Sequence, residues 1–475
     1  MEILPREMVD GNSSYNITLT RTKKKTNLHY STVVKSKVVM LCGKSWGLSP
    51  KMTLWIYKSV IRPMVSHGAV AWWAKTLQVG GVRALSGIQR LACLSVTGAM
   101  RTSPTAALEV LLNLPPLHIY IQGVVKAVVI RLMIGQAPIT VRHGGAYQEL
   151  YEELEADPIL GLPSDFMTPK YNFDKPFKVC IGDREAWTRG PPVEGDSIWY
   201  TDGSKMEEGV GAGVYGTKPK YSFSVSLGKL ATVFQAELAA IRFCAAEIKG
   251  RGIINSKVVI FSDSQAALRA ISSYQVNSRL VWDCLGALKE ISDQNKVFLV
   301  WVPGHSGHKG NEAADLLARE GSAGRFVGPE PCFGVPKCVK AATINLWVQS
   351  RSQEWWLATT GQRQAKEFIK GYSPRLTAEL IRQGRGAIRM IVGLLTGHCR
   401  LRKHMHRMGL ADDSLCRFCQ EEEETALHVL CQCEGLVWLR MLLLGEEKPR
   451  PVSFTQESLS SIKSLIKRTG LESEL

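Results

Sequence analysis

The sequence has few of the features that mark a secreted or membrane-spanning protein. No basic stretch followed by an apolar run stands at its N-terminus, and its 12 cysteines are scattered over 475 residues. The best candidate for a membrane span, residues 123–141, is interrupted by Lys126 and Arg131, so a buried amphipathic helix explains it better. We therefore expect an intracellular protein, cytoplasmic or nuclear, with reduced cysteines and no membrane partner.

The sequence also lacks an internal repeat of fixed period, which argues against a solenoid. Its 45% hydrophobic and 21% charged residues are near globular averages, and its length suits roughly two to four domains. Lysines and arginines outnumber acids by 59 to 43, and this net charge of +16 favours a polyanionic partner such as nucleic acid. Composition leaves the oligomeric state open.

Changes in composition divide the chain. We expect a disordered tail at 1–35, a helical segment at 36–144, a linker at 145–195, a mixed domain at 196–322, a second linker at 323–345, a helical segment at 346–440 and a tail at 441–475. The first linker ends in the run 189–192, whose two prolines cannot continue a helix or a central strand.

The segment 196–322 combines two hydrophobic patterns. Three short β-like runs, at 198–201, 210–215 and 221–227, are separated by glycine-rich turns, which favours antiparallel pairing. Helices at 232–249 and 276–291 then alternate with the apolar strands 258–261 and 297–302, which favours parallel pairing. The sequence thus predicts an α/β fold with a mixed five-stranded sheet flanked by helices, and mainly helical N- and C-terminal segments.

Four acids of this domain occupy positions typical of a site. Asp202 ends the first strand, Asp263 follows the fourth strand, and Asp315 lies where a glycine-rich loop leads into a helix. Strand ends are where open α/β sheets build their sites. We therefore expect these carboxylates to gather at one edge of the sheet.

The fourth acid, Glu237, lies on an apolar helical stripe with Phe234 and Ile241, so we expect it to face the core. An unpaired buried carboxylate is costly, and neighbouring acids repel each other. Divalent cations relieve both costs. Oxygen ligands suit Mg²⁺ or Mn²⁺, and two such ions can activate water and stabilise the leaving oxygen of a phosphodiester.

Four blocks of the domain, at 201–204, 236–238, 262–265 and 304–315, resemble the signature blocks of type 1 ribonuclease H, in that family's order Asp, Glu, Asp, Asp. The resemblance implies a ribonuclease H-like fold that hydrolyses the RNA strand of RNA:DNA hybrids by two-metal-ion catalysis. The site residues that it implies are the Mg²⁺ or Mn²⁺ ligands Asp202, Glu237, Asp263 and Asp315, and the mobile histidine His305.

His305 would assist proton transfer or product release, although a histidine flanked by glycines is also compatible with a structural loop. His308 has no counterpart in the family and is expected to face solvent. Ser204, Thr232 and Gln265 lie near the acids and are candidates for contacts to the 2′-hydroxyls of the hybrid. Helix caps and turn formers remain the alternative for these three residues.

The segments 46–50, 88–91 and 97–108 resemble the thumb region that follows the reverse-transcriptase palm in non-LTR retrotransposon polyproteins. A plain helical bundle is the alternative. The aromatic-Ala-Asp-Asp motif of a palm is missing upstream, so we expect no polymerase activity, and we expect that the N-terminus is a truncation.

Cys416, Cys419, His428 and Cys433 have the ligand types and number of a small structural Zn²⁺ site, at 416–433. The same retroelements carry a similar zinc-knuckle-like element after their ribonuclease H domain. Cys431 leaves the fourth ligand open, and a helix with reduced cysteines is the alternative. The basic cluster at 400–407 suits nucleic acid or a solvated helix face.

Two other functions remain open. The first alternative to an active hybrid nuclease is a catalytically silent nucleic-acid-binding remnant of a mobile element. A transposase or integrase is less favoured, because those enzymes use a different order of acids.

Overall fold

The computed structural model describes residues 47–134, 145–187, 190–456 and 459–473. The chain forms two compact units, one made by residues up to 125 and from 347 onward, the other by 126–346. The expected tail at 1–35 lies outside the described residues. Each unit is described by itself.

The unit at 126–346 contains a mixed six-stranded sheet in the order β2-β8-β6-β3-β4-β5. Its strands are β2 (Lys178–Cys180), β3 (Ser197–Lys205), β4 (Val210–Lys218), β5 (Lys220–Ser226), β6 (Lys257–Ser262) and β8 (Lys296–Trp301). Strands β3, β4 and β5 pair antiparallel, and β3, β6, β8 and β2 pair parallel. The predicted α/β class with a mixed sheet is confirmed. The sixth strand, β2, lies in the stretch that we interpreted as a linker. We missed it because its three residues are too few to give an apolar pattern.

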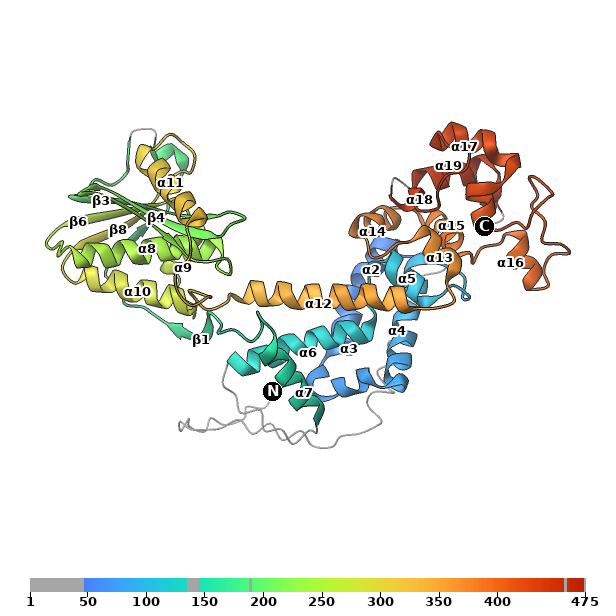
Figure 1. Cartoon of the computed structure of the whole chain (residues 1–475), viewed down its shortest axis with the longest axis horizontal. Coiled ribbons are helices and arrows are strands. Elements are labelled where there is room, and N and C mark those ends of the chain that lie inside the picture. The colour runs from blue at the N-terminus through green and yellow to red at the C-terminus, as the bar shows by residue number, and fades with distance from the viewer. Residues whose placement is uncertain (1–46, 135–144, 188–189, 457–458, 474–475) are drawn as a thin grey trace, which may run out of the picture. The chain divides into compact units, whose positions relative to one another are not determined.

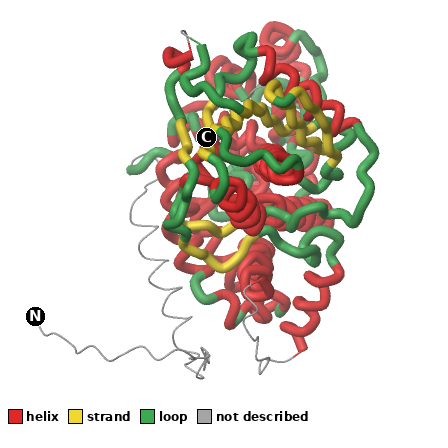
Figure 2. The backbone as a smooth tube through the Cα atoms, turned by 90° about the vertical axis from the view of Figure 1, so that its left-hand side faces the viewer, coloured by secondary structure: helices red, strands yellow, loops and turns green. Residues whose placement is uncertain are grey.

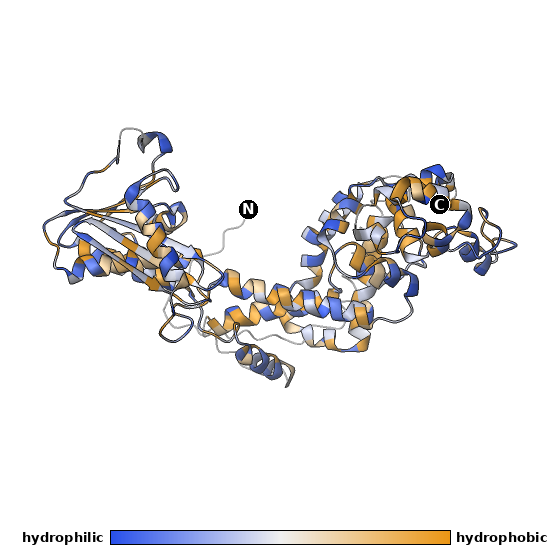
Figure 3. Cartoon of the chain, turned by 45° about the horizontal axis from the view of Figure 1, so that its top comes forward, coloured by the Kyte–Doolittle hydropathy of each residue, from blue (hydrophilic) through white to orange (hydrophobic). Residues whose placement is uncertain are grey.

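Helices cover both faces of this sheet: α8 and α10 lie on one face and α11 on the other (Figure 1). The helices that surround this sheet are α8 (Val233–Gly250), α9 (Gln265–Ser272), α10 (Arg279–Ser292) and α11 (Lys309–Ala323). Hydroxyl side chains begin three of them: Thr232 forms a capping box with Gln235, and Ser264 and Ser278 cap α9 and α10. Their apolar sides pack on the sheet while hydrophilic residues face outward (Figure 3).

Two glycines let α11 approach β4 closely. A Cβ atom at Gly211 would lie 2.2 Å from the Ser322 amide nitrogen, and one at Gly213 would lie 2.3 Å from the Ala314 carbonyl oxygen. Backbone therefore packs on backbone here. Since α11 carries Asp315, this contact also positions an acid of the site.

Two local predictions in this unit were wrong. The helix expected from 276 begins at Arg279, because Gln275–Ser278 form strand β7, which pairs antiparallel with β1 (Phe166–Tyr171). Phe234, assigned to the core-facing stripe of α8, is 36% exposed. The stretches interpreted as linkers also carry α7 (Gly145–Ala156), β1 and the start of α12 (Lys337–Ala358).

The other unit is helical, as expected for the flanking segments, and the colouring by secondary structure distinguishes its helices from the strands of the sheet (Figure 2). Its longer helices are α2 (Pro50–Ile56), α4 (Val79–Thr97), α5 (Thr105–Leu111), α14 (Pro374–Ile381), α15 (Arg385–Thr396), α17 (Val437–Leu444) and α19 (Ser460–Arg468). Described residues from the N-terminal and C-terminal parts of the sequence share one apolar core, whose members include Leu108, Leu394 and Ile462.

One helix, α6 (Leu117–Ile134), is long and apolar enough to cross a membrane by length and composition alone. Half of it is buried inside the structure, and a core helix passes the same test. The ammonium group of Lys126 on this helix is buried and lies 2.7 Å from a Glu153 carboxylate oxygen on α7.

Candidate active site

Asp202 and Asp263 are brought together by the register of two parallel strands. Thr201 of β3 is paired with Ser262 of β6, so the residues that follow these two lie next to each other. Each of these residues is an aspartate. Asp202 accepts a hydrogen bond from the amide of Gly203 at 2.9 Å.

Glu237 reaches the same place from α8. A Cβ atom at Gly203 would lie 2.5 Å from the Glu237 amide nitrogen, so only glycine allows the helix to pack this closely on β3. Glu237 is buried, and its Oε2 atom has no hydrogen-bond partner. A buried carboxylate oxygen without a protein partner is positioned to bind a cation or a water molecule.

One oxygen of each of Asp202, Glu237 and Asp263 lies within 4.8 Å of the others. Burial, with the Asp263 charge next, raises the pKa of Asp202 to about 7. Burial and the charges of Asp202 and Asp263 raise the pKa of Glu237 well above its usual value. Burial also raises the pKa of Asp263. The three oxygens and their electrostatic cost fit divalent cations with oxygen ligands.

Asp315 lies beside this group but outside the set of three. Its charge contributes to the raised pKa values of Asp202 and Asp263. On α11 it also forms an ion pair with Arg319, with Arg319 Nη2 2.8 Å from Asp315 Oδ2. The structure thus places all four predicted acids at one edge of the sheet and gives the fourth a cationic partner.

The loop after β8 carries His305 at the rim of the site. A Cβ atom at Gly304 would lie 2.8 Å from Asp263 Oδ2, so this glycine lets the loop pass close to the acids. His305 has a positive φ of 52°, is exposed, and lowers the pKa of Asp263 through its charge. His308, expected to face solvent, is instead half-buried with its ring 4.5 Å from that of Trp187.

Asn311 is a site residue that the sequence reasoning missed. It is buried at the start of α11, its Nδ2 atom donates to Asp263 Oδ2 at 3.4 Å, and its Oδ1 atom has no partner. This hydrogen bond lowers the pKa of Asp263 and so partly offsets the effect of burial. Its position four residues before Asp315, on the same helical face, was the available signal.

The three candidate substrate contacts have local roles in this structure. Thr232 caps α8, and the Gln265 side chain accepts a hydrogen bond from Arg269 at 3.1 Å. Ser204 is half-buried, and its carbonyl oxygen accepts from the Ser322 hydroxyl at 3.0 Å. Their contacts to a hybrid stay a prediction.

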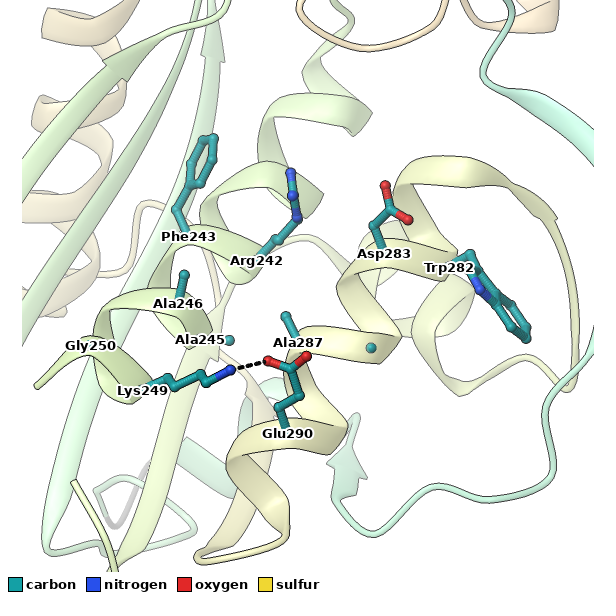
Figure 4. Close-up of a pocket in the computed structure, with 11 residues that line it drawn as sticks. Arg242, Phe243, Ala245, Ala246, Lys249, Gly250, Trp282, Asp283, Ala287 and Glu290 are labelled. Carbon is teal, nitrogen blue, oxygen red and sulfur yellow. Dashed lines mark hydrogen bonds and ion pairs between the residues drawn. The ribbon is translucent and has the colours of Figure 1, made fainter. Parts of the chain in front are cut away.

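A cavity of about 870 Å³ lies between α8 and α10, away from the acids. An ion pair between Lys249 and Glu290, 2.9 Å apart, bridges the two helices, and Arg242 and Asp283 come from opposite helices (Figure 4). Its lining includes none of the four acids or His305. The acid group, rather than this cavity, is the candidate for chemistry.

A second group, Cys416, Cys419, His428 and Cys433, has one ligand atom of each residue within 4.8 Å of the others. The sulfurs of Cys416 and Cys433 are 3.7 Å apart, close to the roughly 3.8 Å that two thiolates bound to a tetrahedral zinc ion adopt. The structure places Cys433 in this group and leaves Cys431 outside it. The four donors are compatible with zinc.

The surroundings of this Cys/His group also suit a metal. A Glu422 oxygen lies 3.0 Å from Nδ1 of His428, which leaves Nε2 facing Cys419 Sγ at 3.3 Å. Backbone amides of residues 421 and 422 lower the pKa of Cys419 to about 7. Burial and the neighbouring thiols raise the pKa of Cys433 to about 12.

Asp202 does not end its strand as we expected, because β3 runs on to Lys205 in its pairing with β4. A mixed sheet covered by helices, with carboxylates just beyond the last parallel pair of β3 and β6, is consistent with a ribonuclease H-like nuclease fold. Residues 194–323 match the family model of RNase H, so the chain contains a ribonuclease H domain.

Individual proteins are similar to shorter stretches. A ribonuclease H of Pseudomonas entomophila is 38% identical over 77 residues, covering 14% of this chain and 52% of that protein. Human ribonuclease H1 is 30% identical over 158 residues, covering 28% of this chain and 54% of that protein. A 115 kDa protein of a type-1 retrotransposable element of Drosophila melanogaster is 39% identical over 74 residues, covering 16% of this chain and 7% of that protein. The chain thus spans about half of the first two relatives and a small part of the third.

Proposed function

We propose that this protein is a divalent-metal-dependent endoribonuclease that hydrolyses the RNA strand of RNA:DNA hybrids. The observation that carries the proposal is the convergence of Asp202, Glu237 and Asp263 to within 4.8 Å, with an unpartnered buried oxygen on Glu237. The match of residues 194–323 to the RNase H family and the net charge of +16 support it.

Asp202, Glu237 and Asp263 would hold Mg²⁺ or Mn²⁺, and Asp315 would complete the set. When bound, two such ions supply the positive charge that activates water and stabilises the leaving oxygen of a phosphodiester. Asn311 holds the Asp263 carboxylate in position through its amide. His305, on an exposed loop beside Asp263, is placed to take or deliver a proton.

The test is incubation of the purified full chain with an end-labelled RNA:DNA hybrid and Mg²⁺, beside Asp263→Asn. We expect the native protein to cut only the RNA strand and the variant to have lost at least about 99% of that activity. Asp283→Asn is the matched control, because Asp283 is an exposed acid of the same unit that lines the cavity between α8 and α10.

Equal cutting by the native protein and Asp263→Asn would point to a contaminant. Binding of the hybrid without cutting by any variant would favour the second function, a catalytically silent nucleic-acid-binding protein. That alternative has one specific observation in its favour, the ion pair that Arg319 forms with Asp315.

We also propose that the Cys416, Cys419, His428 and Cys433 group holds a structural zinc ion as a zinc-knuckle-like element. The 3.7 Å separation of two sulfurs and the contact of Glu422 with His428 support this proposal. The local similarity to a retrotransposable-element protein supports an origin as part of a retrotransposon polyprotein. We propose a cytoplasmic or nuclear location, where hybrids arise and thiols stay reduced.

A further inference from the structure

Three exposed aromatic rings lie together at one end of the small β1/β7 sheet. Tyr171, Phe173 and Tyr274, here called the aromatic stack, are 63%, 74% and 61% exposed. The rings of Tyr171 and Phe173 are within 6° of parallel at a centroid distance of 6.3 Å. Those of Phe173 and Tyr274 are within 27° at 5.5 Å. Three large, nearly parallel rings are thus held open to solvent.

The backbone fixes this arrangement. Tyr171 pairs with Gln275 across the β1/β7 sheet, and the amide of Asn172 donates to the Tyr274 carbonyl at 2.9 Å. The Asn172 side chain accepts from the amide of residue 174 at 3.1 Å and so closes a turn beneath Phe173. The rings are therefore ordered without being buried in a core. Clustered exposed apolar surface of this kind marks an interaction site.

The stretch of sequence that carries two of the three rings is mainly positive. The stretch 170–178 contains three lysines and one acid, Asp174. That acid is already paired, with its Oδ2 atom 2.6 Å from the ammonium group of Lys289. The ammonium group of Lys175 lies 5.2 Å from the centre of the Tyr274 ring, held there by the carbonyls of residues 271 and 273. A ligand that fits here offers flat rings and negative charge.

The aromatic stack is also connected to the acid group. Helix α9 begins two residues after Asp263 and ends two residues before Tyr274. Its eight residues span about 12 Å. A polynucleotide strand that leaves the acids along α9 would therefore meet the stack after a few nucleotides. Two of the three rings come from residues that precede the segment matched by the RNase H family.

We propose that the aromatic stack binds the unpaired bases of single-stranded nucleic acid by stacking, while the neighbouring lysines contact its phosphates. Aromatic rings bind bases without sequence preference because every base has a flat face. Proline-rich peptides also dock on exposed aromatics, but they do not use the positive charge. This binding needs no cleavage, so it stands apart from the proposed nuclease activity.

The test compares two fluorescent probes of about 12 nucleotides, oligothymidine and the same sugar-phosphate chain without bases. Binding is measured by fluorescence anisotropy with the full chain in EDTA, so that no hydrolysis occurs. Basic surfaces elsewhere bind both probes alike, so the ratio of the two affinities isolates stacking. The variants are the triple change Tyr171→Ala, Phe173→Ala and Tyr274→Ala, and the matched control Tyr171→Phe with Tyr274→Phe, which keeps all three rings.

We expect the native protein to bind oligothymidine at least about five-fold more tightly than the abasic chain, which is the contribution expected from one base stacked on one ring. The alanine variant should lose this preference and the phenylalanine control should keep it. Photo-crosslinking of an iodinated oligonucleotide should label the peptide that contains Tyr171 and Phe173. Equal affinity of the native protein for both probes, or an unchanged ratio in a folded alanine variant, would overturn the proposal and leave a protein ligand as the occupant to seek. Hydrolysis of hybrids is measured separately, so loss of one activity does not imply loss of the other.

Discussion

Replacing Asp202 by Asn should stabilise the metal-free domain while abolishing its activity. Asp202 is buried next to Asp263 and Glu237, and its ionised form is disfavoured there. Asparagine has nearly the same shape and no charge. The substitution therefore removes repulsion among the three acids, although it also removes an oxygen ligand for the proposed cations.

The magnitude follows from the pKa. Burial and Asp263 raise the pKa of Asp202 from 3.8 to about 7. Below pH 4 both the native and the unfolded states hold the proton, so the group has no effect on stability. Between pH 4 and 7 the unfolded chain releases its proton first, and the native state loses stability as the pH rises. Above pH 7 the full penalty is present, about 4 kcal/mol as an upper limit. Because the three acids share their protons, we expect a gain of about 2 kcal/mol in Asp202→Asn at pH 8.

The assay is amide hydrogen exchange of the full chain in EDTA, read on peptides from β3 and α8 at pH 5 and pH 8. Exchange reports the opening of this domain alone, whereas a thermal melt would mix both units. We expect the variant to exchange more slowly than the native protein at pH 8, relative to their behaviour at pH 5. Added Mg²⁺ should slow exchange in the native protein and change the variant little.

Asp315→Asn is the matched control. Its carboxylate belongs to the same site but pairs with Arg319, so its loss should stabilise the metal-free domain less than Asp202→Asn does. An Asp202→Asn variant that opens as readily as the native protein at pH 8 in EDTA would refute the electrostatic reasoning. Stabilisation of both variants to the same extent would mean that the ion pair does not protect Asp315.

Three further predictions concern other parts of the chain. Cys433→Ser should lose the bound zinc and Cys431→Ser should keep it, as measured by metal content after dialysis, because only Cys433 joins the four-ligand group. Gly213→Ala should lower the free energy of unfolding by about 2 kcal/mol and reduce cleavage, because its Cβ would lie 2.3 Å from a carbonyl oxygen of α11. Gly250→Ala should do neither, because a Cβ atom there would have no other atom within 4 Å. Burial raises the pKa of Glu109 to about 8, so the helical unit of the native protein should lose stability as the pH rises from 5 to 8. Glu109→Gln should remove this loss, as measured by hydrogen exchange.

The sequence predicted the parts of the fold that depend on repeating patterns. Strands β3 to β6 and β8 and helix α8 lie within a few residues of their predicted bounds, since each carries several apolar residues at a regular spacing. The short strands β2 and β7 were missed because their positions depend on partners distant in the chain. Strand β7 pairs with β1, more than 100 residues earlier, and this pairing replaced the first turn of a predicted helix.

The site divides in the same way. The identities of Asp202, Glu237, Asp263 and Asp315 were readable from local blocks, but their geometry was not. Register across two strands brings the first and third together, and a helix packed on Gly203 brings the second. Asn311 and Arg319 each lie four residues from Asp315 on α11, so their spacing was visible in the sequence. The contact of Asn311 with Asp263 was not, because it joins two elements.

The two candidate metal groups differ in what they do before a metal binds. At the Cys/His group, backbone amides lower the pKa of Cys419 and Glu422 contacts His428, so part of the group is already set for a cation. At the acid group, burial and mutual repulsion raise the pKa of Asp202 to about 7, so protons compete with cations for its oxygens. Binding of the proposed cations at the acids should therefore strengthen as the pH rises toward 7 and release protons as it does so. At the Cys/His group, burial raises the pKa of Cys433 to about 12, so a cation there must also displace a proton, from a thiol rather than from a carboxyl group.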